Sequence, residues 1–227
     1  MSHWRESINS WGGIPVAVAF VAIVGFIVAV IMFSISGANE ESYKAKIYEN
    51  AEGRVLGISG APVRIIEFGD LQCSHCKTFH DDIAPKIIED FISSGIATLE
   101  FRHLAFLGPE SILAATAAEC ALEQEHYWDY IDLLFFKQNP NSKSTFSTTN
   151  LKKYARELEN HYPNFDVIQF DSCLNSLEKR ELVINMSEDA LRLGFSSTPT
   201  FLINGIPFSN SGQYEAFRTA IESAAKK

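Results

Sequence analysis

The sequence predicts an α/β domain in which a strand–helix–strand unit and a strand–strand–helix unit flank an inserted helical domain, with one transmembrane helix at the N-terminus. Three observations support this prediction: a long uncharged segment near the N-terminus, strand and helix patterns at both ends of the remainder, and a helical pattern throughout residues 109–195. Of the 227 residues, 46% are hydrophobic and 21% are charged. This composition suffices for a folded core and excludes a disordered chain.

The uncharged segment covers residues 7–39 and contains a nearly wholly apolar run at residues 14–35. About 20 such residues cross the hydrocarbon core of a bilayer as a helix. We therefore expect a transmembrane anchor at residues 14–35, behind a cytoplasmic N-terminus at residues 1–13. The alternative is a signal peptide cleaved after Ala38, since small residues precede that position. A signal core spans only about 7–15 residues, which favours the uncleaved anchor.

The net charge of −9 lies almost entirely after the apolar run. Residues 1–39 hold one basic and one acidic residue, so the other 188 residues hold 18 basic and 27 acidic ones. An acidic domain without a cluster of Lys or Arg repels phosphate backbones, so we expect no nucleic-acid partner. Arg5 on one side of the anchor and Lys44 and Lys46 on the other leave its orientation undecided by charge.

The first elements of the domain follow a linker. Residues 36–61 are rich in Gly, Ser and charged residues with little periodicity, so they predict a linker that ends where the domain of residues 62–227 begins. Residues 63–68 have the compact, β-branched sequence VRIIEF and predict a buried strand that stops at Gly69.

A helix and a second strand come next. Apolar residues recur every four positions over residues 74–93, which predicts a helix with a kink at Pro85. Residues 97–103 alternate between apolar and polar side chains and predict a strand with one solvent-facing side. Together with the first strand, these elements form a strand–helix–strand unit.

The rest of the chain consists of the helical domain and a C-terminal hairpin and helix. The helical domain spans about residues 109–195, with amphipathic or Ala-rich pieces at residues 111–122, 127–137, 150–158 and 174–193. Two short strands are then predicted at residues 200–203 and 206–208 around Asn204-Gly205, a strong hairpin signal, and Pro207 favours an edge position for the second. A last amphipathic helix begins near Tyr214.

Cys73 and Cys76 form a C-x-x-C motif directly after a predicted strand and at the start of a predicted helix. Unpaired backbone N–H groups and the helix dipole favour an anion there, so we expect Cys73 to be an exposed, activated nucleophile and Cys76 to be the resolving thiol. His75, when protonated, adds positive charge beside the sulfur. Stabilising the thiolate stabilises the reduced form, which makes the disulfide a stronger oxidant.

Two other interpretations of this motif remain open. Cys73 and Cys76 with His80 would supply three zinc ligands, with Cys120 or Cys173 as the fourth. The two cysteines would otherwise form a purely structural disulfide. The zinc interpretation leaves the strand-to-helix placement unexplained, so we favour redox chemistry and expect no metal.

Two further positions complete the predicted site. Thr198-Pro199 enters the hairpin strand, and beside a C-x-x-C helix it predicts a cis-proline loop that presents backbone groups to an extended substrate, whereas a trans turn is the alternative. Glu67 is an acid in an otherwise apolar strand and is expected to lie in the core beneath the dithiol. Burial would raise its pKa and let it relay the proton of Cys76, unless Glu67 lies exposed on an edge strand.

The segments EFGDLQCSHC (residues 67–76) and TPTFLING (residues 198–205), with helices inserted between them, resemble the DsbA-like branch of the thioredoxin superfamily. The resemblance covers about residues 53–225. It implies a thioredoxin fold and a thiol-disulfide oxidoreductase outside the cytoplasm. It also implies five site residues: the nucleophile Cys73, the resolving Cys76, the tuning His75, the buried acid Glu67 and the cis-proline Pro199. Two positions depart from the family pattern, because Ser74 replaces a proline and Thr198 replaces a β-branched hydrocarbon.

The other two cysteines lie in the helical domain. If Cys73 pairs with Cys76, only Cys120 and Cys173 remain to pair, and such a bridge persists only in an oxidising compartment. Two buried free thiols are the alternative. The single histidines His103, His126 and His161 are spaced with no other ligand, and we expect structural roles for them.

These observations predict a single-pass cell-membrane protein whose catalytic domain faces the extracytoplasmic side. It would use the Cys73–Cys76 disulfide, with no separate cofactor, to introduce disulfides into unfolded or partly folded exported proteins. The resemblance implies reoxidation by a quinone-linked membrane protein of the DsbB or VKOR type. A disulfide reductase or isomerase of the same fold and a non-enzymatic anchored binding module are the alternatives.

Overall fold

The computed structural model describes residues 13–36, 43–46, 48, 50–139, 141–142 and 144–226. The chain divides into two compact units, Met1–Tyr43 and Lys44–Lys227. The first contains helix α2 (Gly13–Ser36), whose side chains are described for residues 18–30 and are exposed. Within the described part of the chain, no helix has the length and apolar character needed to cross a membrane. Residues 1–12 of the predicted N-terminus (residues 1–13) and the alternative cut after Ala38 lie outside the described residues.

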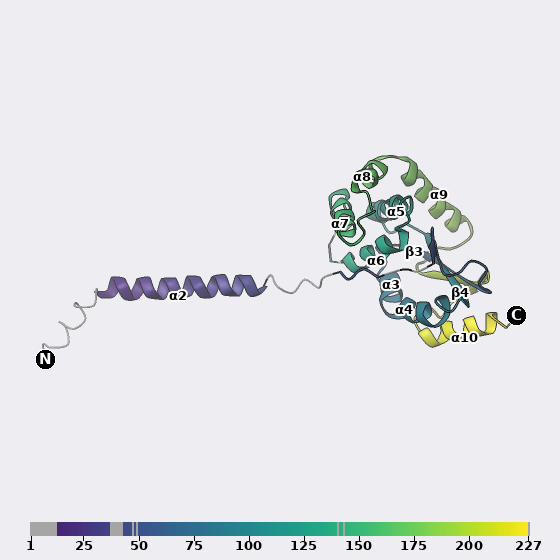
Figure 1. Cartoon of the computed structure of the whole chain (residues 1–227), viewed down its shortest axis with the longest axis horizontal. Helices are drawn as coiled ribbons and strands as arrows, with labels where there is room; N and C mark the ends of the chain where they lie inside the picture. Colours follow the sequence, from purple (N-terminus) through teal and green to yellow (C-terminus); the bar gives the residue numbers. More distant parts are fainter. Residues whose placement is uncertain are drawn as a thin grey trace. The chain divides into compact units, whose positions relative to one another are not determined.

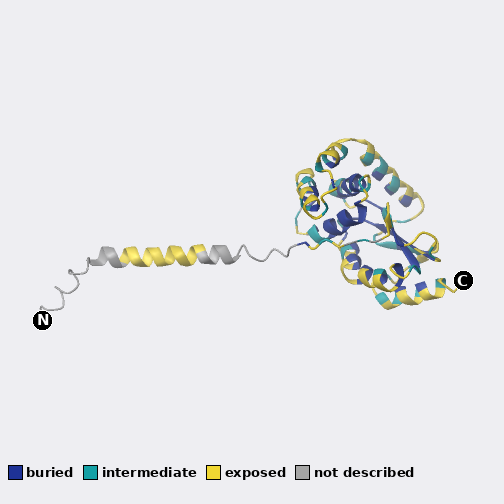
Figure 2. Ribbon diagram, viewed as in Figure 1, coloured by how far each residue is buried: buried dark blue, intermediate teal, exposed yellow. Residues whose placement is uncertain are grey.

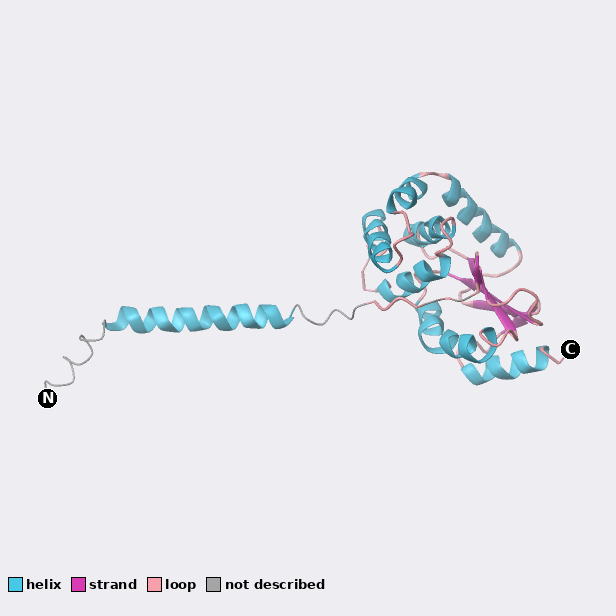
Figure 3. Cartoon of the chain, viewed as in Figure 1, coloured by secondary structure: helices cyan, strands magenta, loops and turns pink. Residues whose placement is uncertain are grey.

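The second unit is built on a sheet of six strands in the order β1-β2-β4-β3-β5-β6. Figure 3 shows the strands, in magenta, with helices on either side of them. The central strand β3 pairs in parallel with β4 and antiparallel with β5. The strands are β1 (Ala51–Glu52), β2 (Val55–Leu56), β3 (Val63–Gly69), β4 (Ala97–His103), β5 (Thr200–Ile203) and β6 (Ile206–Phe208). The strand–helix–strand and hairpin units predicted from the sequence therefore form one sheet, with Pro207 on its edge strand β6.

The first two strands correct the predicted linker. Residues 36–61 lack periodicity, yet β1 and β2 lie within this range and β2 pairs antiparallel with β4. Arg54 in the turn between them binds Glu119 of the helical domain through Nε to Oε1, at 2.7 Å. A strand of two residues is too short to show an alternating pattern in the sequence. Its position depends on the neighbouring strand and on this ion pair. The folded domain therefore begins before Pro62.

Both faces of the sheet are covered. The helix that follows β3 and the C-terminal helix α10 (Tyr214–Ala224) pack on one face (Figure 1). On this face the ring centroids of Phe79 and Phe201 lie 4.6 Å apart. Helix α9 (Glu178–Arg192) packs on the other face. Thr98 and Glu100 are consequently buried, so β4 does not have the solvent-facing side that its alternating pattern predicts. Figure 2 shows strands β3 and β4 and helix α6 as the buried centre of this unit.

The helix after β3 is continuous from Ser74 to Ile92 but changes its winding three times. It consists of α3 (Ser74–Thr78), the π-helical turn η1 (Phe79–Ile83), α4 (Ala84–Ile87) and the π-helical turn η2 (Ile88–Ile92). Pro85 lies in the first turn of α4, directly after η1. A proline has no N–H to donate, and the wider π turn before it accommodates the missing hydrogen bond. A change of helix type therefore lies beside Pro85, the position where the sequence predicts a kink.

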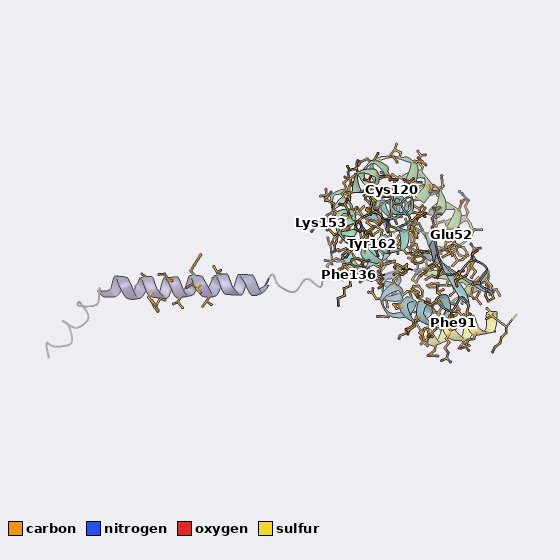
Figure 4. The ribbon with its side chains drawn as sticks, in the orientation of Figure 1. Glu52, Phe91, Cys120, Phe136, Lys153 and Tyr162 are labelled. Carbon is orange, nitrogen blue, oxygen red and sulfur yellow. A yellow bond between two sulfur atoms is a disulfide. The ribbon has the colours of Figure 1, made fainter. Side chains whose placement is uncertain are left out.

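Among the described residues of 109–195 there are five helices. Figure 1 shows α5, α7, α8 and α9 gathered at one end of the unit. The five helices are α5 (Pro109–Leu122), α6 (Tyr127–Lys137), α7 (Thr148–His161), α8 (Val167–Asn175) and α9. Where the sequence suggests one piece over residues 174–193, the structure separates α8 from α9 at Ser176 and Leu177. A disulfide between Cys120 of α5 and Cys173 of α8 joins two of these helices (Figure 4).

Candidate active site

The two thiols of the C-x-x-C motif lie where β3 turns into the helix. Cys73 occupies the N-cap position of α3, and its backbone N–H donates to the carbonyl of Asp70 at 2.9 Å. Both cysteines are free thiols in this structure. Cys73 is 8% exposed and Cys76 is fully buried, so Cys73 is the more accessible sulfur although it is less exposed than its predicted role suggests. Small reactants reach one sulfur only.

Hydrogen bonds lower the pKa of Cys73 from its ordinary value of 9.0 to about 5. The largest cause is the hydrogen bond from the Cys76 thiol, which outweighs the opposing effect of burial. The Thr198 side chain and the backbone N–H groups of Cys76 and His75 add to the stabilisation of the thiolate. The side chain of His75 is exposed, and the backbone N–H of His75 at the helix start helps to lower the pKa of Cys73. The sequence points only to the imidazole of His75.

Thr198 interacts with the sulfur of Cys73 through its backbone carbonyl and through its side chain. The thiol of Cys73 donates to the backbone carbonyl of Thr198 at 3.3 Å, which favours the protonated form. The Thr198 side chain stabilises the thiolate, which favours the charged form. The peptide bond between Thr198 and Pro199 is cis, as the sequence predicts, and β5 starts at the next residue.

Cys76 has the opposite character. Burial is the largest cause that raises its pKa, and the hydrogen bond to Cys73 and the charge of Glu67 act in the same direction. A thiolate released at Cys76 must therefore take up a proton, whereas one released at Cys73 stays charged at neutral pH. Cys73 is thus the better leaving group of the pair and Cys76 the poorer one.

Glu67 lies in the core, as predicted, and not on an exposed edge. Its side chain is fully buried on the central strand β3, and burial raises its pKa against the opposing effect of His80. Glu67 Oε2 is 2.9 Å from His80 Nε2. Within the described residues Glu67 Oε1 has no hydrogen-bond partner. His80 is therefore the hydrogen-bonding partner of the buried acid.

Asp70 and Gln138 support the site although the sequence did not single them out. Asp70 is buried, and its carboxylate accepts the backbone N–H groups of Gln72, Phe106 and Leu107 at 2.8–3.1 Å. Gln138 Nε2 donates to the carbonyls of Leu71 and Cys73. An Asp directly after a strand commonly binds backbone N–H groups of the following turn, which is a usable signal for Asp70. Gln138 is distant in sequence and carries no such signal.

The Cys120–Cys173 bridge is formed, with a Cα–Cα distance of 5.7 Å. Neither residue is then available as a fourth zinc ligand for Cys73, Cys76 and His80. In the described part of the chain, no group of three or more His, Cys, Asp or Glu side chains is arranged to hold a metal ion.

Comparisons with known proteins agree with this geometry. A thioredoxin family model matches residues 49–223. The disulfide bond formation protein D of Bacillus subtilis is 31% identical over 177 residues, which is 76% of this chain and 77% of that protein. A probable disulfide bond formation protein D of Bacillus anthracis is 28% identical over 95% of each chain. The crystal structure of oxidised BdbD from Bacillus subtilis has a TM-score of 0.70 at 28% identity and covers 83% of this chain and 100% of that one. The site agrees with these relatives, because it has a C-x-x-C thiol pair of unequal acidity at a helix start and a cis-proline beside it. The chain therefore belongs to the thioredoxin family, as a DsbA-like thiol-disulfide oxidoreductase.

Proposed function

We propose that the protein is a dithiol oxidase that introduces disulfides into exported proteins through Cys73 and Cys76. The observation that carries the proposal is the unequal acidity of the two thiols, with the pKa of Cys73 lowered to about 5 and that of Cys76 raised. A thiolate that is stable down to about pH 5 stabilises the reduced form at pH 7 by about 3 kcal/mol, or about 60 mV. This shifts the disulfide toward oxidising its substrate.

The proposed reaction has two exchanges. A substrate thiolate attacks Sγ of Cys73, the Cys73–Cys76 bond breaks, and the electron pair passes to Cys76, which takes up a proton. A second substrate thiolate then attacks the substrate sulfur of the mixed disulfide, and Cys73 leaves as a thiolate. Two electrons pass from the substrate dithiol to the protein. Thr198 and Pro199 lie beside Cys73 and offer backbone groups to an extended chain.

The reduced protein needs an electron acceptor to complete its cycle. A quinone-linked membrane protein of the DsbB or VKOR type is the proposed partner, and no separate cofactor is needed besides the Cys73–Cys76 disulfide. An extracytoplasmic location is supported by the Cys120–Cys173 disulfide, because such bridges persist in oxidising compartments.

Residues 14–35 are proposed to anchor the domain in the cell membrane as a single helix. The support is the sequence alone, an almost wholly apolar run of the length that crosses a bilayer as a helix. Carbonate extraction of membranes tests the anchor: the full chain should stay in the pellet, and a chain lacking residues 1–39 should be released. Release of the full chain would contradict anchoring.

The reduction potential of the Cys73–Cys76 pair against glutathione tests the oxidase role. We expect a value above about −200 mV, whereas a value near about −270 mV is typical of a reductase. In cells that make the protein, the Cys76→Ala variant should trap exported proteins as mixed disulfides on Cys73. The Cys73→Ser variant is the control and should trap none. An oxidising potential with an empty trap would contradict the proposed substrates.

A further inference from the structure

The dithiol loop, residues 70–73 between β3 and α3, is held by a side chain from a distant part of the sequence. Gln138 directly follows the last residue of α6 in the helical domain and is buried. Its Nε2 donates to the carbonyl of Leu71 at 2.7 Å and to the carbonyl of Cys73 at 3.1 Å. One buried amide therefore binds two carbonyls of the loop that carries the nucleophile.

The orientation of the Gln138 amide follows from these two bonds. Both partners are carbonyl oxygens, which only accept hydrogen bonds, so the NH₂ group must face them and Oε1 must point elsewhere. Oε1 is buried without a partner among the described residues. A buried acceptor without a partner disfavours the folded state, so stability alone does not explain a glutamine at this position. The two bonds that Gln138 makes to the dithiol loop point to a role there.

The Cys73 carbonyl lies at the start of the dithiol helix. It belongs to the planar peptide unit that joins Cys73, the N-cap residue, to the first residue of α3, and it also accepts the N–H of Lys77 at 3.1 Å. The next backbone N–H groups, those of His75 and Cys76, stabilise the Cys73 thiolate. Their direction depends on how this peptide unit is rotated. A bond from the helical domain to its carbonyl therefore restrains the donors that face the sulfur.

A second hydrogen bond joins the end of α6 to the same helix. Lys77 directly follows Cys76, and its Nζ donates to the carbonyl of Phe135 in the last turn of α6 at 2.6 Å. Carbonyls at the C-terminal end of a helix carry partial negative charge, so an ammonium group is favourable there. The end of α6 thus binds the first turn of α3 at its N-cap and again four residues later (Figure 1).

We propose that Gln138 is a positioning residue, which holds the backbone of Leu71 and Cys73 so that the N–H groups at the start of α3 face the Cys73 sulfur. The proposal rests on the dithiol oxidase function and deepens it, because the helical domain then helps to set how strongly the disulfide oxidises its substrates. Gln138 binds the carbonyl of Cys73 and not its sulfur, so it acts through the backbone.

Gln138→Met tests the proposal, because methionine has a similar length and no donor. The absorbance of the thiolate against pH should show that the pKa of Cys73 rises by about one unit, and the equilibrium with glutathione at pH 7 should shift about tenfold toward the disulfide. Cys76 and Glu67, the other ionisable groups that interact with Cys73, are unchanged in this variant. The difference from the wild type should vanish toward pH 4, where the thiol is protonated in both proteins.

Gln124→Met is the matched control. Gln124 Nε2 donates to the backbone carbonyl of Asp166 at 3.0 Å, so this variant loses a bond of the same kind before the start of α8. Its Cys73 should keep the wild-type pKa and the wild-type equilibrium with glutathione. A merely structural role of Gln138 would destabilise both redox forms alike. An unchanged pKa and equilibrium in Gln138→Met, or a shift of the equilibrium that is equally large at pH 4, would overturn the proposal.

Gln138→Asn covers the case in which Gln138→Met fails to fold. Asparagine keeps a buried amide, but its side chain is one methylene shorter, so the amide should reach at most one of the two carbonyls. The pKa of Cys73 should rise in the same direction by a smaller amount. A folded Gln138→Asn protein with the wild-type pKa at Cys73 would overturn the proposal.

The proposed function is scored separately, by oxidation of a reduced unfolded protein by the wild-type chain. If that activity is absent while Gln138→Met still raises the pKa of Cys73 and shifts the equilibrium with glutathione, the oxidase role fails and the positioning role stands. If the activity is present and Gln138→Met keeps the wild-type pKa and equilibrium, only the positioning role fails.

Discussion

The two sulfurs of the dithiol are three residues apart yet differ in acidity because their surroundings differ. Cys73 keeps a small exposed surface and meets hydrogen-bond donors, whereas Cys76 is enclosed by the core and faces Glu67. Desolvation disfavours a negative charge on both sulfurs. The hydrogen-bond donors around Cys73 outweigh this effect and lower the pKa of that thiol. This difference favours exchange with substrate at Cys73 and leaves Cys76 as the sulfur that takes up a proton.

Alkylation of the reduced chain should follow this difference. Because the thiolate is the reactive form, iodoacetamide should label Cys73 with a midpoint near pH 5. Cys76 should stay essentially unlabelled up to pH 9, since burial and a raised pKa both protect it. Peptide mass spectrometry distinguishes the two sites. Equal and slow labelling of both cysteines would contradict the activated nucleophile.

Thr198→Val should raise the pKa of Cys73. The substitution keeps the shape and the backbone carbonyl but removes the hydroxyl that stabilises the thiolate. A hydrogen bond to a charged group contributes about 1.5–3 kcal/mol, so the pKa should rise by about one unit or more. The absorbance of the thiolate, followed against pH, measures the pKa of Cys73 in the variant. Thr200→Val is the control, because that hydroxyl donates to the carbonyl of Ser197 and should leave Cys73 unchanged.

The helical domain is attached to the sheet through ion pairs as well as through apolar packing. Glu119 of α5 is buried and accepts from Arg54 in the turn between β1 and β2, and His103 of β4 lies 3.3 Å away. Burial alone would raise the pKa of Glu119, but these partners hold it at about 2. The short β1–β2 hairpin therefore joins two parts of the domain that are distant in sequence.

Arg54→Leu should destabilise the oxidised protein by about 3 kcal/mol, because a buried carboxylate loses its main partner. Urea unfolding measures the change. Arg64→Leu is the matched control: that guanidinium is half exposed, and its partner Glu100 keeps Arg102. We expect it to cost less than about 1 kcal/mol. Equal costs for the two variants would mean that the Arg54–Glu119 pair does not hold the hairpin.

The stability of the whole domain should depend on pH differently in its two redox states. In the reduced protein the pKa of Cys73 is about 5 when folded and 9.0 ordinarily, so between these values the unfolded chain binds one more proton. Stability then rises with pH, by about 1.4 kcal/mol per unit from this group. It is fully present above about pH 9 and is lost as the pH falls through about 5.

Thermal unfolding of reduced and oxidised protein between pH 4 and pH 8 tests this dependence. Relative to the oxidised form, whose sulfurs do not titrate, the reduced form should gain stability steadily above about pH 5. A Cys73→Ser protein is the control and should lack this gain, because serine does not ionise in this range. Parallel curves for the reduced and oxidised proteins would contradict a lowered pKa at Cys73.

Local patterns in the chain were sufficient for the principal elements. The strands at residues 63–69, 97–103, 200–203 and 206–208 and the C-terminal helix follow from β-branched runs, alternation, the Asn204-Gly205 turn and helical periodicity. The C-x-x-C motif and Thr198-Pro199 were recognisable for the same reason, because each is a short run of residues. Elimination favoured Cys120 with Cys173 and left two buried free thiols as the alternative, and the structure contains the bridge.

Tertiary packing decided what these patterns left open. The β1–β2 hairpin, the burial of Thr98 and Glu100, and the support from Gln138 depend on segments far away in the sequence. The acidity of Cys73 and the pairing of Glu67 with His80 likewise depend on which groups folding brings within a few ångströms. Periodicity records only which side of an element is apolar. Hydrogen bonding and desolvation depend on distances in three dimensions, so residue types identified the dithiol while the fold decided how its two thiols differ.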